Sequence, residues 1–196
     1  MMYEYPDGDY TTREKIWQEH VDYTKGLLYF LTHDERVPSK LRDQVSRFGW
    51  AQDEFVDNDN FPTQLYVREA RRLNGEYIMT QKNCQGEETV GDAIGMAAYG
   101  MDSHNCQRIV TNGMVKNEGD VQYHGFPPYP ISYKSITPKR EECTNLLVPV
   151  CISSTHIAFG SIRMEPVFMV LGQSAAVASA LAIEDNTDVQ TQDVTK

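Results

Sequence analysis

Two clusters of polar residues contain the side chains best suited to chemistry in this chain. The first, Ser153 to Arg163, combines His156 with serines, a glycine and an arginine, and the second, Tyr99 to Asn105, brings Asp102 close to His104 in the sequence. A histidine whose tautomer is fixed by a carboxylate or carbonyl acts as a general acid or base, while a guanidinium binds anionic oxygens. The clusters therefore favour acid–base chemistry on an anionic or polarised group. Polar runs of this kind are also typical of ordinary loops.

The first cluster separates a predicted strand from a predicted helix. Leu146 to Ser153 is rich in valine and isoleucine, which indicates a strand covered on both faces, and Ser153 to Arg163 is expected to form a polar loop. Pro166 suits the first turn of a helix, and Val167 to Ile183 is apolar or small on every side, which predicts a buried core helix. Because this stretch has few large apolar side chains, we expect no membrane span.

The start of that helix is a predicted binding site. The first amide hydrogens of a helix have no intrahelical partners, and the aligned peptide dipoles favour an anion or a polarised carbonyl there. Gly160 and Ser161 allow close approach to the backbone, and Arg163 adds a positive charge. The alternative is a packed core in which Arg163 pairs with Glu165 or with a backbone carbonyl.

Several motifs of this region form one pattern along the chain. They are Asn145 to Pro149, Cys151 to Ser153 with His156, Gly160 to Pro166, and Gly172 to Ala176 followed by an alanine-rich stretch. The pattern resembles the C-terminal signature of FAD-dependent oxidoreductases, in particular of the bacterial flavoproteins often labelled xanthan lyases. The resemblance implies FAD as the cofactor, with the helix start facing the pyrimidine edge of the flavin. It also implies that the flavin-facing turn consists of Gly160, Ser161, Ile162, Arg163 and Met164.

Three arginines lie in a predicted strand region in the middle of the chain. Leu65 to Met79 is expected to form two strand pieces with a bend at Asn74–Gly75. Either Arg68 or Arg72 suits a substrate carboxylate, phosphate or sugar hydroxyl. A salt-bridged sheet surface explains the arginines equally well.

The remaining predicted substrate contacts come from tyrosine-rich and polar segments. Tyr129 to Ile136 is expected to be a strand that edges a cavity, with Tyr133 as a substrate contact. The family resemblance extends to residues 66–72 and 101–105. It implies that Tyr99, Asp102 and His104 line a substrate cavity on a substrate-side sheet.

Local patterns predict the other elements. Thr11 with Glu14 forms a capping-box pattern before an apolar stripe, which predicts a first helix, and Pro38 begins a second helix that is expected to stop at Gly49. Val90 to Ala98 is expected to be a short helix preceded by a loop.

The predicted fold class is α+β, and the resemblance implies the C-terminal part of a two-domain FAD fold like that of glutathione reductase. We expect a helical segment at 1–60 and a substrate-side β-rich domain with a mixed or antiparallel sheet at 61–144. The last strand and helix of the FAD-binding domain would follow at 145–185, and a polar tail at 186–196.

Charge and cysteine content exclude several classes of partner. The net charge is −10 and the pI is about 4.9, so nucleic acid and anionic membrane surfaces would repel the chain. The four cysteines include no CxxC pair, and we expect no metal site. Either a cytoplasmic or a periplasmic location is compatible with this composition.

The glycine-rich turn that holds the pyrophosphate of FAD is not recognisable. That turn needs glycines two positions apart, and none of the 13 glycines has such a neighbour. We therefore expect a C-terminal fragment whose partner is the missing N-terminal FAD-binding half, and which alone is inactive.

The leading functional hypothesis is hydride transfer from an organic substrate, such as a sugar-like alcohol, to the flavin. His156 and His104 would be the acid–base residues, and Arg163 would lie near the flavin or the substrate oxygens. One alternative is a polysaccharide lyase in which Arg68 neutralises a uronate carboxylate and His104 abstracts the neighbouring proton. A second alternative is a non-catalytic binding module.

Overall fold

The computed structural model describes residues 4–67, 69–105 and 107–194. The chain divides into two compact units, Met1–Ala70 and Arg71–Lys196, which we call unit 1 and unit 2. Each unit is described by itself below.

Unit 1 is built on one long helix. Its elements are α1 (Tyr10–His33), α2 (Ser39–Val45) and the short 3-10 helix η1 (Val56–Asn58). The two predicted helices are confirmed, but their ends differ. α1 starts where the Asp9 side chain accepts a hydrogen bond from the Thr12 amide at 2.8 Å, so the predicted capping box is wrong. α2 ends at Val45 and not at Gly49, because the next amides, of Arg47 and Phe48, turn to the carbonyls three residues back, those of Gln44 and Val45.

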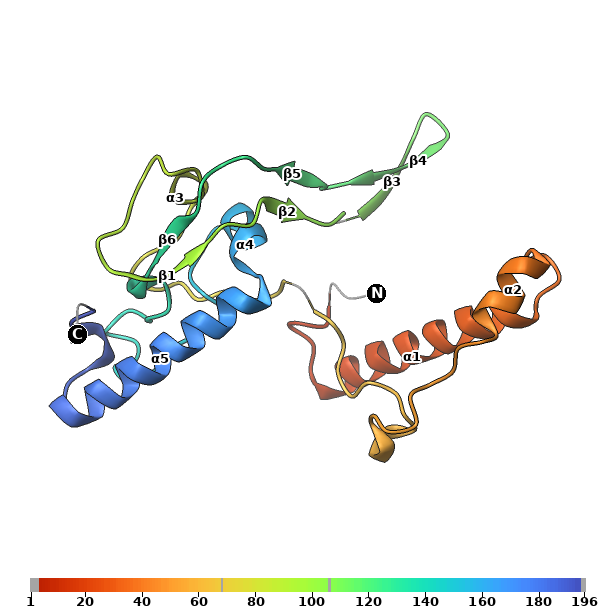
Figure 1. Ribbon diagram of the computed structural model, residues 1–196, viewed down its shortest axis with the longest axis horizontal. Coiled ribbons are helices and arrows are strands. Elements are labelled where there is room, and N and C mark those ends of the chain that lie inside the picture. The colour runs from red at the N-terminus through yellow and green to blue at the C-terminus, as the bar shows by residue number, and fades with distance from the viewer. Residues whose placement is uncertain (1–3, 68, 106, 195–196) are drawn as a thin grey trace. The chain divides into compact units, whose positions relative to one another are not determined.

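Unit 2 contains the remaining helices and the strands (Figure 1). In chain order its described elements are α3 (Gln81–Gln85), β1 (Ala93–Ala97), β2 (Met101–Ser103), β3 (Gln107–Thr111), β4 (Met114–Glu118), β5 (Val121–Tyr123), β6 (Tyr129–Ser132), η2 (Tyr133–Ser135), α4 (His156–Ile162), α5 (Glu165–Asp185) and η3 (Val189–Thr191). The strands pair antiparallel, β1 with β6, β2 with β5 and β3 with β4. Helices beside antiparallel strand pairs make the fold class α+β, as predicted.

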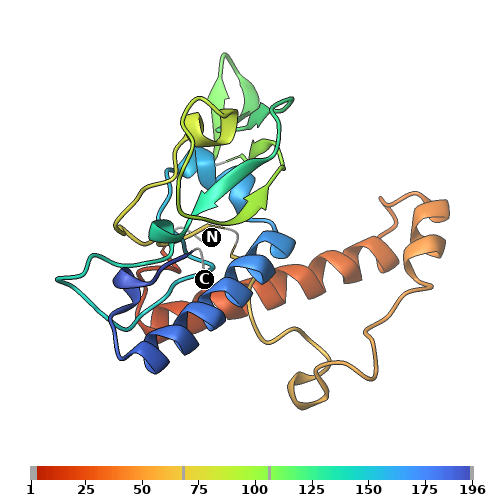
Figure 2. The ribbon, with the colours of Figure 1, turned by 60° about the vertical axis from the view of Figure 1, so that its left-hand side comes forward.

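The core of unit 2 lies between the helices α4 and α5 and the β1–β6 pair (Figures 1 and 2). α5 buries one face, formed by Val167, Leu171, Ala175, Ala178 and Ala182. On its other side Met169 is 72% exposed and Ile183 is 80% exposed. The start and length of α5 were predicted well, but burial on every side was wrong, because within unit 2 one face of the helix has core neighbours. By length and composition α5 also suits a membrane span, a test that core helices of soluble proteins pass as well.

β1 replaces the short helix predicted at 90–98. Ala93, Met96 and Ala97 pair across to β6, which supplies hydrogen bonds that a local pattern does not reveal. Gly95 allows α5 to pack closely, since a Cβ there would stand 2.8 Å from Val170 Cγ1. Small residues in this stretch therefore serve helix–strand packing and not a helix.

The strand predicted at 146–153 is also wrong. The backbone carbonyl of Cys151 accepts a hydrogen bond from the Leu73 amide at 2.8 Å, whereas the Ser153 amide donates to the backbone carbonyl of Ser135 at 2.7 Å. The segment therefore bonds to two different neighbours. Pro149 has no amide hydrogen to donate. The result is an extended connection with an exposed Cys151 instead of a regular ladder.

Two further predictions at neighbouring segments fail for similar reasons. Within the described part of 65–79, Gly75 and Met79 form isolated bridges to Pro138 and Ser154, and no regular strand is assigned. β6 confirms the first half of the strand predicted at 129–136. Its second half is the 3-10 helix η2, which begins where the Ser132 side chain accepts a hydrogen bond from the Lys134 amide.

Candidate functional site

The stretch predicted as a polar loop is mostly the helix α4. Thr155 caps its start by accepting a hydrogen bond from the Ala158 amide, and the apolar side chains of Ala158, Phe159 and Ile162 are buried. This helical spacing of apolar residues overrides the local preference of serine and glycine for loops. Among the residues expected on a flavin-facing turn, Gly160, Ser161 and Ile162 therefore lie buried in α4, and Arg163 and Met164 connect it to α5.

Arg163 contacts Asp102 of β2 at the end of α4. Its Nη2 donates a hydrogen bond to the Asp102 backbone carbonyl at 3.1 Å and lies 3.9 Å from Asp102 Oδ2. The side chains of Arg163 and Asp102 are only 10% and 14% exposed. A largely buried guanidinium beside a carboxylate keeps its charge compensated, so the pair fixes the turn before α5 in place. We call Arg163 and Asp102 the corner pair.

Gly160 allows α4 to approach β2 closely enough for this contact. A Cβ at Gly160 would stand 2.6 Å from the Asp102 carbonyl oxygen and 3.2 Å from the Asp102 nitrogen. These distances are too short for any side chain, so glycine is required by packing at this position.

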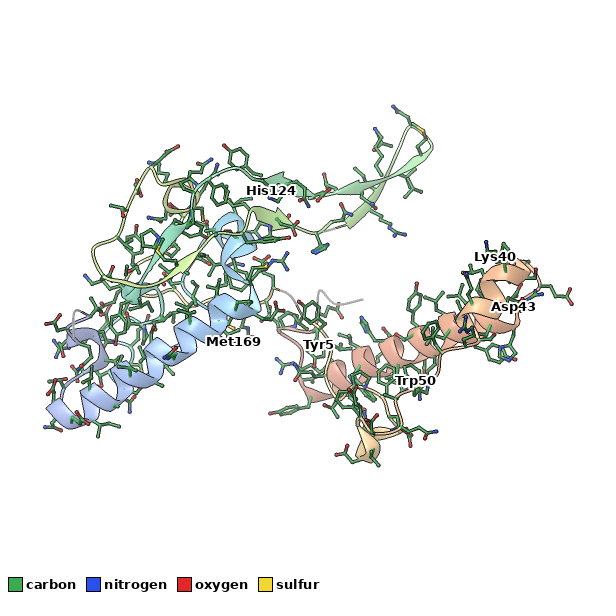
Figure 3. The ribbon with its side chains drawn as sticks, in the orientation of Figure 1. Tyr5, Lys40, Asp43, Trp50, His124 and Met169 are labelled. Atoms are coloured by element: carbon green, nitrogen blue, oxygen red, sulfur yellow. The ribbon has the colours of Figure 1, made fainter. Side chains whose placement is uncertain are left out.

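The carboxylate of Asp102 continues into a hydrogen-bonded chain across β2 and β5. Gln122 Nε2 donates to Asp102 Oδ1 at 2.6 Å, and Gln122 Oε1 lies 3.2 Å from His124 Nε2. Because the amide oxygen only accepts, His124 carries its proton on Nε2 in this contact. The ring of Tyr99 meets the His124 imidazole edge to face at 6.4 Å. His124, labelled in Figure 3, is thus linked to Asp102 of the corner pair through Gln122.

His124 was missed by the sequence reasoning. It reaches this group through the pairing of β2 with β5, in which Asp102 lies opposite Gln122. A Cβ at Gly100 would overlap the His124 imidazole, so the glycine also makes room for that ring. Within the sequence, the only sign of this contact is the glycine after Tyr99, and a glycine after an aromatic residue is too common to identify a site.

The hydroxyl of Ser161 is occupied inside the core. Ser161 Oγ hydrogen-bonds with Tyr129 Oη at 2.6 Å and donates to the Tyr99 carbonyl. Tyr129 and Cys84 are both buried. Burial raises the pKa of the Tyr129 hydroxyl and of the Cys84 thiol, so both groups stay protonated near neutral pH.

The start of α5 is exposed beside the corner pair. Met164 provides no side-chain cap for the helix, and Glu165 and Pro166 are exposed. A 21-residue helix whose first turn lies open next to Arg163 offers partial positive charge at its end. The Val167 and Phe168 amides already donate to the Met164 carbonyl, Pro166 has no amide hydrogen, and Glu165 adds a negative charge in the first turn. Arg163 is therefore the main positive group here that fits the pyrimidine edge of a flavin, which gains negative charge on reduction. The start of α5 offers no counterpart of the glycine turn that holds a pyrophosphate.

The two predicted histidines are exposed at the ends of their elements. His156 is exposed in the first turn of α4, and Arg163 follows the last turn, so about 10 Å of helix separates them. His104 is exposed just after β2. Arg68 lies outside the described residues.

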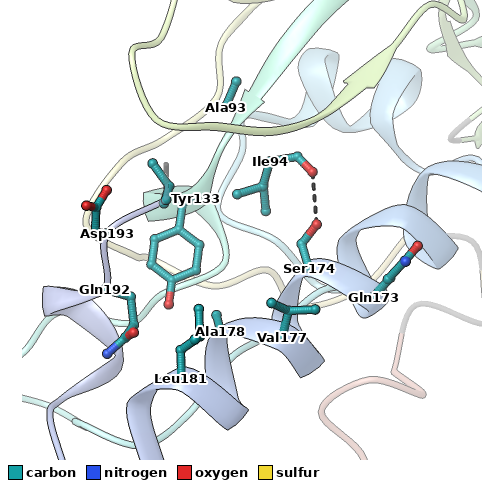
Figure 4. A pocket seen from close by; sticks show the side chains of 11 residues that line it. Ala93, Ile94, Tyr133, Gln173, Ser174, Val177, Ala178, Leu181, Gln192 and Asp193 are labelled. Carbon is teal, nitrogen blue, oxygen red and sulfur yellow. Dashed lines mark hydrogen bonds between the residues drawn. The ribbon is translucent and has the colours of Figure 1, made fainter. Parts of the chain in front are cut away.

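Tyr133 lies in a separate cavity beside the middle of α5 (Figure 4). The cavity has a volume of about 340 Å³ and its walls include Ile94, Ser174, Val177, Ala178 and Leu181. Tyr133 donates from its hydroxyl to the Val189 carbonyl at 2.7 Å, and burial, assisted by Glu76, raises the pKa of Tyr133 to about 12. The structure thus brings Tyr99, Asp102, Ser161 and Arg163 together and places Tyr133 elsewhere.

Comparisons with known proteins identify the family. The family model for FAD dependent oxidoreductases matches residues 1–196, which is the full length of the sequence given. Neither the curated proteins nor the solved structures yielded a match. The match spans every residue discussed above, and it agrees with the resemblance carried by residues 145–176. The chain belongs to the FAD dependent oxidoreductase family.

Proposed function

We propose that this chain forms the substrate side and the flavin-closing segment of an oxidoreductase with a two-domain fold like that of glutathione reductase. The reaction is the transfer of a hydride from an organic substrate, such as a sugar-like alcohol, to FAD. The observation that carries this proposal is the corner pair, which holds Arg163 beside the exposed start of α5. Membership of the family makes FAD the expected cofactor.

The contribution of the protein at this place is electrostatic. When bound, the flavin supplies a hydride acceptor at N5 and takes on negative charge at its pyrimidine edge. If that edge lies beside Arg163, the guanidinium and the start of α5 would stabilise the charge. Asp102 orients Arg163, and Met164 belongs to the turn that faces the ring. Ser161 contributes through its backbone position, because its hydroxyl is engaged with Tyr99 and Tyr129.

We assign the acid–base and substrate contacts to side chains on the same unit. His104 and His156 are exposed and therefore accessible to a substrate proton. Tyr99 lies beside His124, which adds a third imidazole to the candidates. Tyr133 is a further proposed substrate contact, and Arg68, which lies outside the described residues, stays a prediction from the sequence.

The FAD pyrophosphate needs a partner segment. None of the 13 glycines in the sequence is two positions from another, so we propose that the glycine turn lies outside these 196 residues. On this proposal the chain is the C-terminal part of the functional enzyme and has no redox activity alone.

A comparison of two spectroscopic signals tests the proposal. The protein is expressed from its complete coding region and purified without added cofactor. We expect a yellow preparation with flavin absorbance that bleaches when an oxidisable alcohol is added anaerobically. A colourless preparation that produces the absorbance of unsaturated uronate from an acidic polysaccharide would overturn it in favour of a lyase.

A further inference from the structure

A hydrogen-bonded chain runs through the core of unit 2. Tyr129 comes from β6 and Ser161 from α4, and both are at most 1% exposed. The Tyr129 hydroxyl lies 2.6 Å from Ser161 Oγ, and Ser161 in turn bonds with the carbonyl of Tyr99. The chain therefore joins β6 and α4 to the segment that leads into β2.

The direction of the protons follows from the last acceptor. The Tyr99 carbonyl only accepts, so the single hydroxyl proton of Ser161 points to it. The proton between Ser161 and Tyr129 must then come from Tyr129. The hydroxyl protons of Ser161 and Tyr129 are therefore both used inside the protein.

The same chain supports the corner pair from behind. Ser161 lies two residues before Arg163, and Tyr99 lies three residues before Asp102. The bond from Ser161 to Tyr99 thus ties α4 to the β2 segment next to the contact of Arg163 with Asp102. Tyr129 anchors that tie to β6, which is paired with β1.

We propose that Tyr129 is a positioning residue, which acts through Ser161 and the Tyr99 carbonyl to hold Arg163 against Asp102. The importance of this role for flavin chemistry rests on the proposed function, but the geometric claim does not. Removing the Tyr129 hydroxyl takes away the anchor of Ser161 and lets the end of α4 move relative to β2.

The test measures the environment of Arg163 in the full chain without any cofactor. The Nη–H signals of the Arg163 guanidinium are followed by NMR, and their exchange with water is compared between the wild type and Tyr129→Phe. We expect exchange to become about tenfold faster, which corresponds to the loss of about one hydrogen bond of support. Tyr123→Phe is the matched control, because Tyr123 is 50% exposed in β5 and should leave the exchange rate unchanged.

A second variant keeps the test decisive if Tyr129→Phe does not fold. Ser161→Ala removes the same tie at its other end and should accelerate Arg163 exchange to a similar degree. A merely structural role would instead accelerate exchange throughout unit 2, including at the buried Leu171 and Ala178 amides of α5. Unchanged Arg163 exchange, or an equal change at those amides, would overturn the proposal.

A flavin measurement separates this inference from the proposed function. In the protein expressed from its complete coding region, Tyr129→Phe should shift the flavin absorption bands and Tyr123→Phe should not. Wild-type protein without flavin would refute the proposed function, and the exchange result would still decide the role of Tyr129. Bound flavin with unaltered bands in Tyr129→Phe would count against the positioning role.

Discussion

Arg163 and Asp102, 61 positions apart in the sequence, meet through a 3.1 Å hydrogen bond from the guanidinium to the backbone carbonyl. The contact joins the end of α4 to β2 and sets the turn from which α5 begins. It also joins residues from the two polar clusters of the sequence. The following predictions test this arrangement and its consequences.

Arg163→Ala should destabilise unit 2 clearly. The substitution leaves the largely buried Asp102 carboxylate without its cation, which should lower the free energy of unfolding by about 1–3 kcal/mol. Arg140→Ala is the control, because Arg140 pairs with Asp188 at 2.6 Å but is 61% exposed and should cost less than about 1 kcal/mol. Urea unfolding of the full chain measures both changes, and equal losses would contradict a special role of the corner pair.

Two glycine substitutions should have opposite effects. Gly160→Ala places a Cβ 2.6 Å from the Asp102 carbonyl oxygen and should destabilise the protein by about 1–3 kcal/mol. Gly172→Ala in α5 meets no atom within 4 Å and should stabilise it by about 0.5–1 kcal/mol, since alanine favours helices. The midpoint of thermal unfolding of the two variants, compared with that of the wild type, measures both effects. A stabilising Gly160→Ala would show that α4 does not pack against β2 as described.

Local patterns in the sequence predicted some of this structure and missed the rest for physical reasons. Pro166 and the run of small apolar residues after it are sufficient to predict α5, because helix propensity and first-turn proline are local effects. Gly95 looked helical among its small neighbours, yet its role depends on β6 and on Val170, which lie far away in the sequence. Long-range pairing of this kind overrides propensity.

At the candidate site, too, local features were predicted and long-range contacts were missed. Arg163 was recognised as a residue of interest, and pairing with a backbone carbonyl was among the alternatives, but Asp102 as its partner was not foreseen. His124 had no local signal, because only the β2–β5 register brings it near Asp102 through Gln122. The sequence therefore indicated that Arg163 belongs to the site, but it did not reveal which residues Arg163 contacts.

Stability should fall at high pH because of buried tyrosines. Burial raises the pKa of Tyr133 from 10.0 to about 12, and the pKa of Tyr129 is raised as well. Between pH 10.0 and about 12 the unfolded chain loses the phenolic proton of Tyr133 while the folded chain keeps it. This ionisation lowers the free energy of the unfolded state and so reduces the stability of the folded state. The contribution of Tyr133 is fully present below pH 10.0 and is lost as the pH rises to about 12, with a slope of about 1.4 kcal/mol per pH unit.

Unfolding of the Tyr133→Phe variant measures this pH dependence. The variant should lose stability less steeply above pH 10 than the wild type does, because the phenolic group is gone. Tyr23→Phe, at an exposed position of α1, should follow the wild-type curve. Identical curves for Tyr133→Phe and the wild type would show that Tyr133 is not buried.

Thiol labelling should distinguish two cysteines of unit 2. Cys84 is buried and its pKa is raised by that burial, so native protein should protect it from a thiol reagent. Cys151 is exposed and should react in the native state. Peptide mass spectrometry after brief labelling gives both results, and labelling of Cys84 before Cys151 would contradict the burial of Cys84.

The reduction potential of the bound flavin tests the central claim most directly. In the protein expressed from its complete coding region, Arg163→Ala removes a positive charge beside the start of α5 and should make the potential more negative by about 20–40 mV, the equivalent of about 1–2 kcal/mol. Arg140→Ala should leave the potential unchanged. A flavin whose affinity and potential are the same with and without Arg163 would contradict the placement of its pyrimidine edge at this helix start.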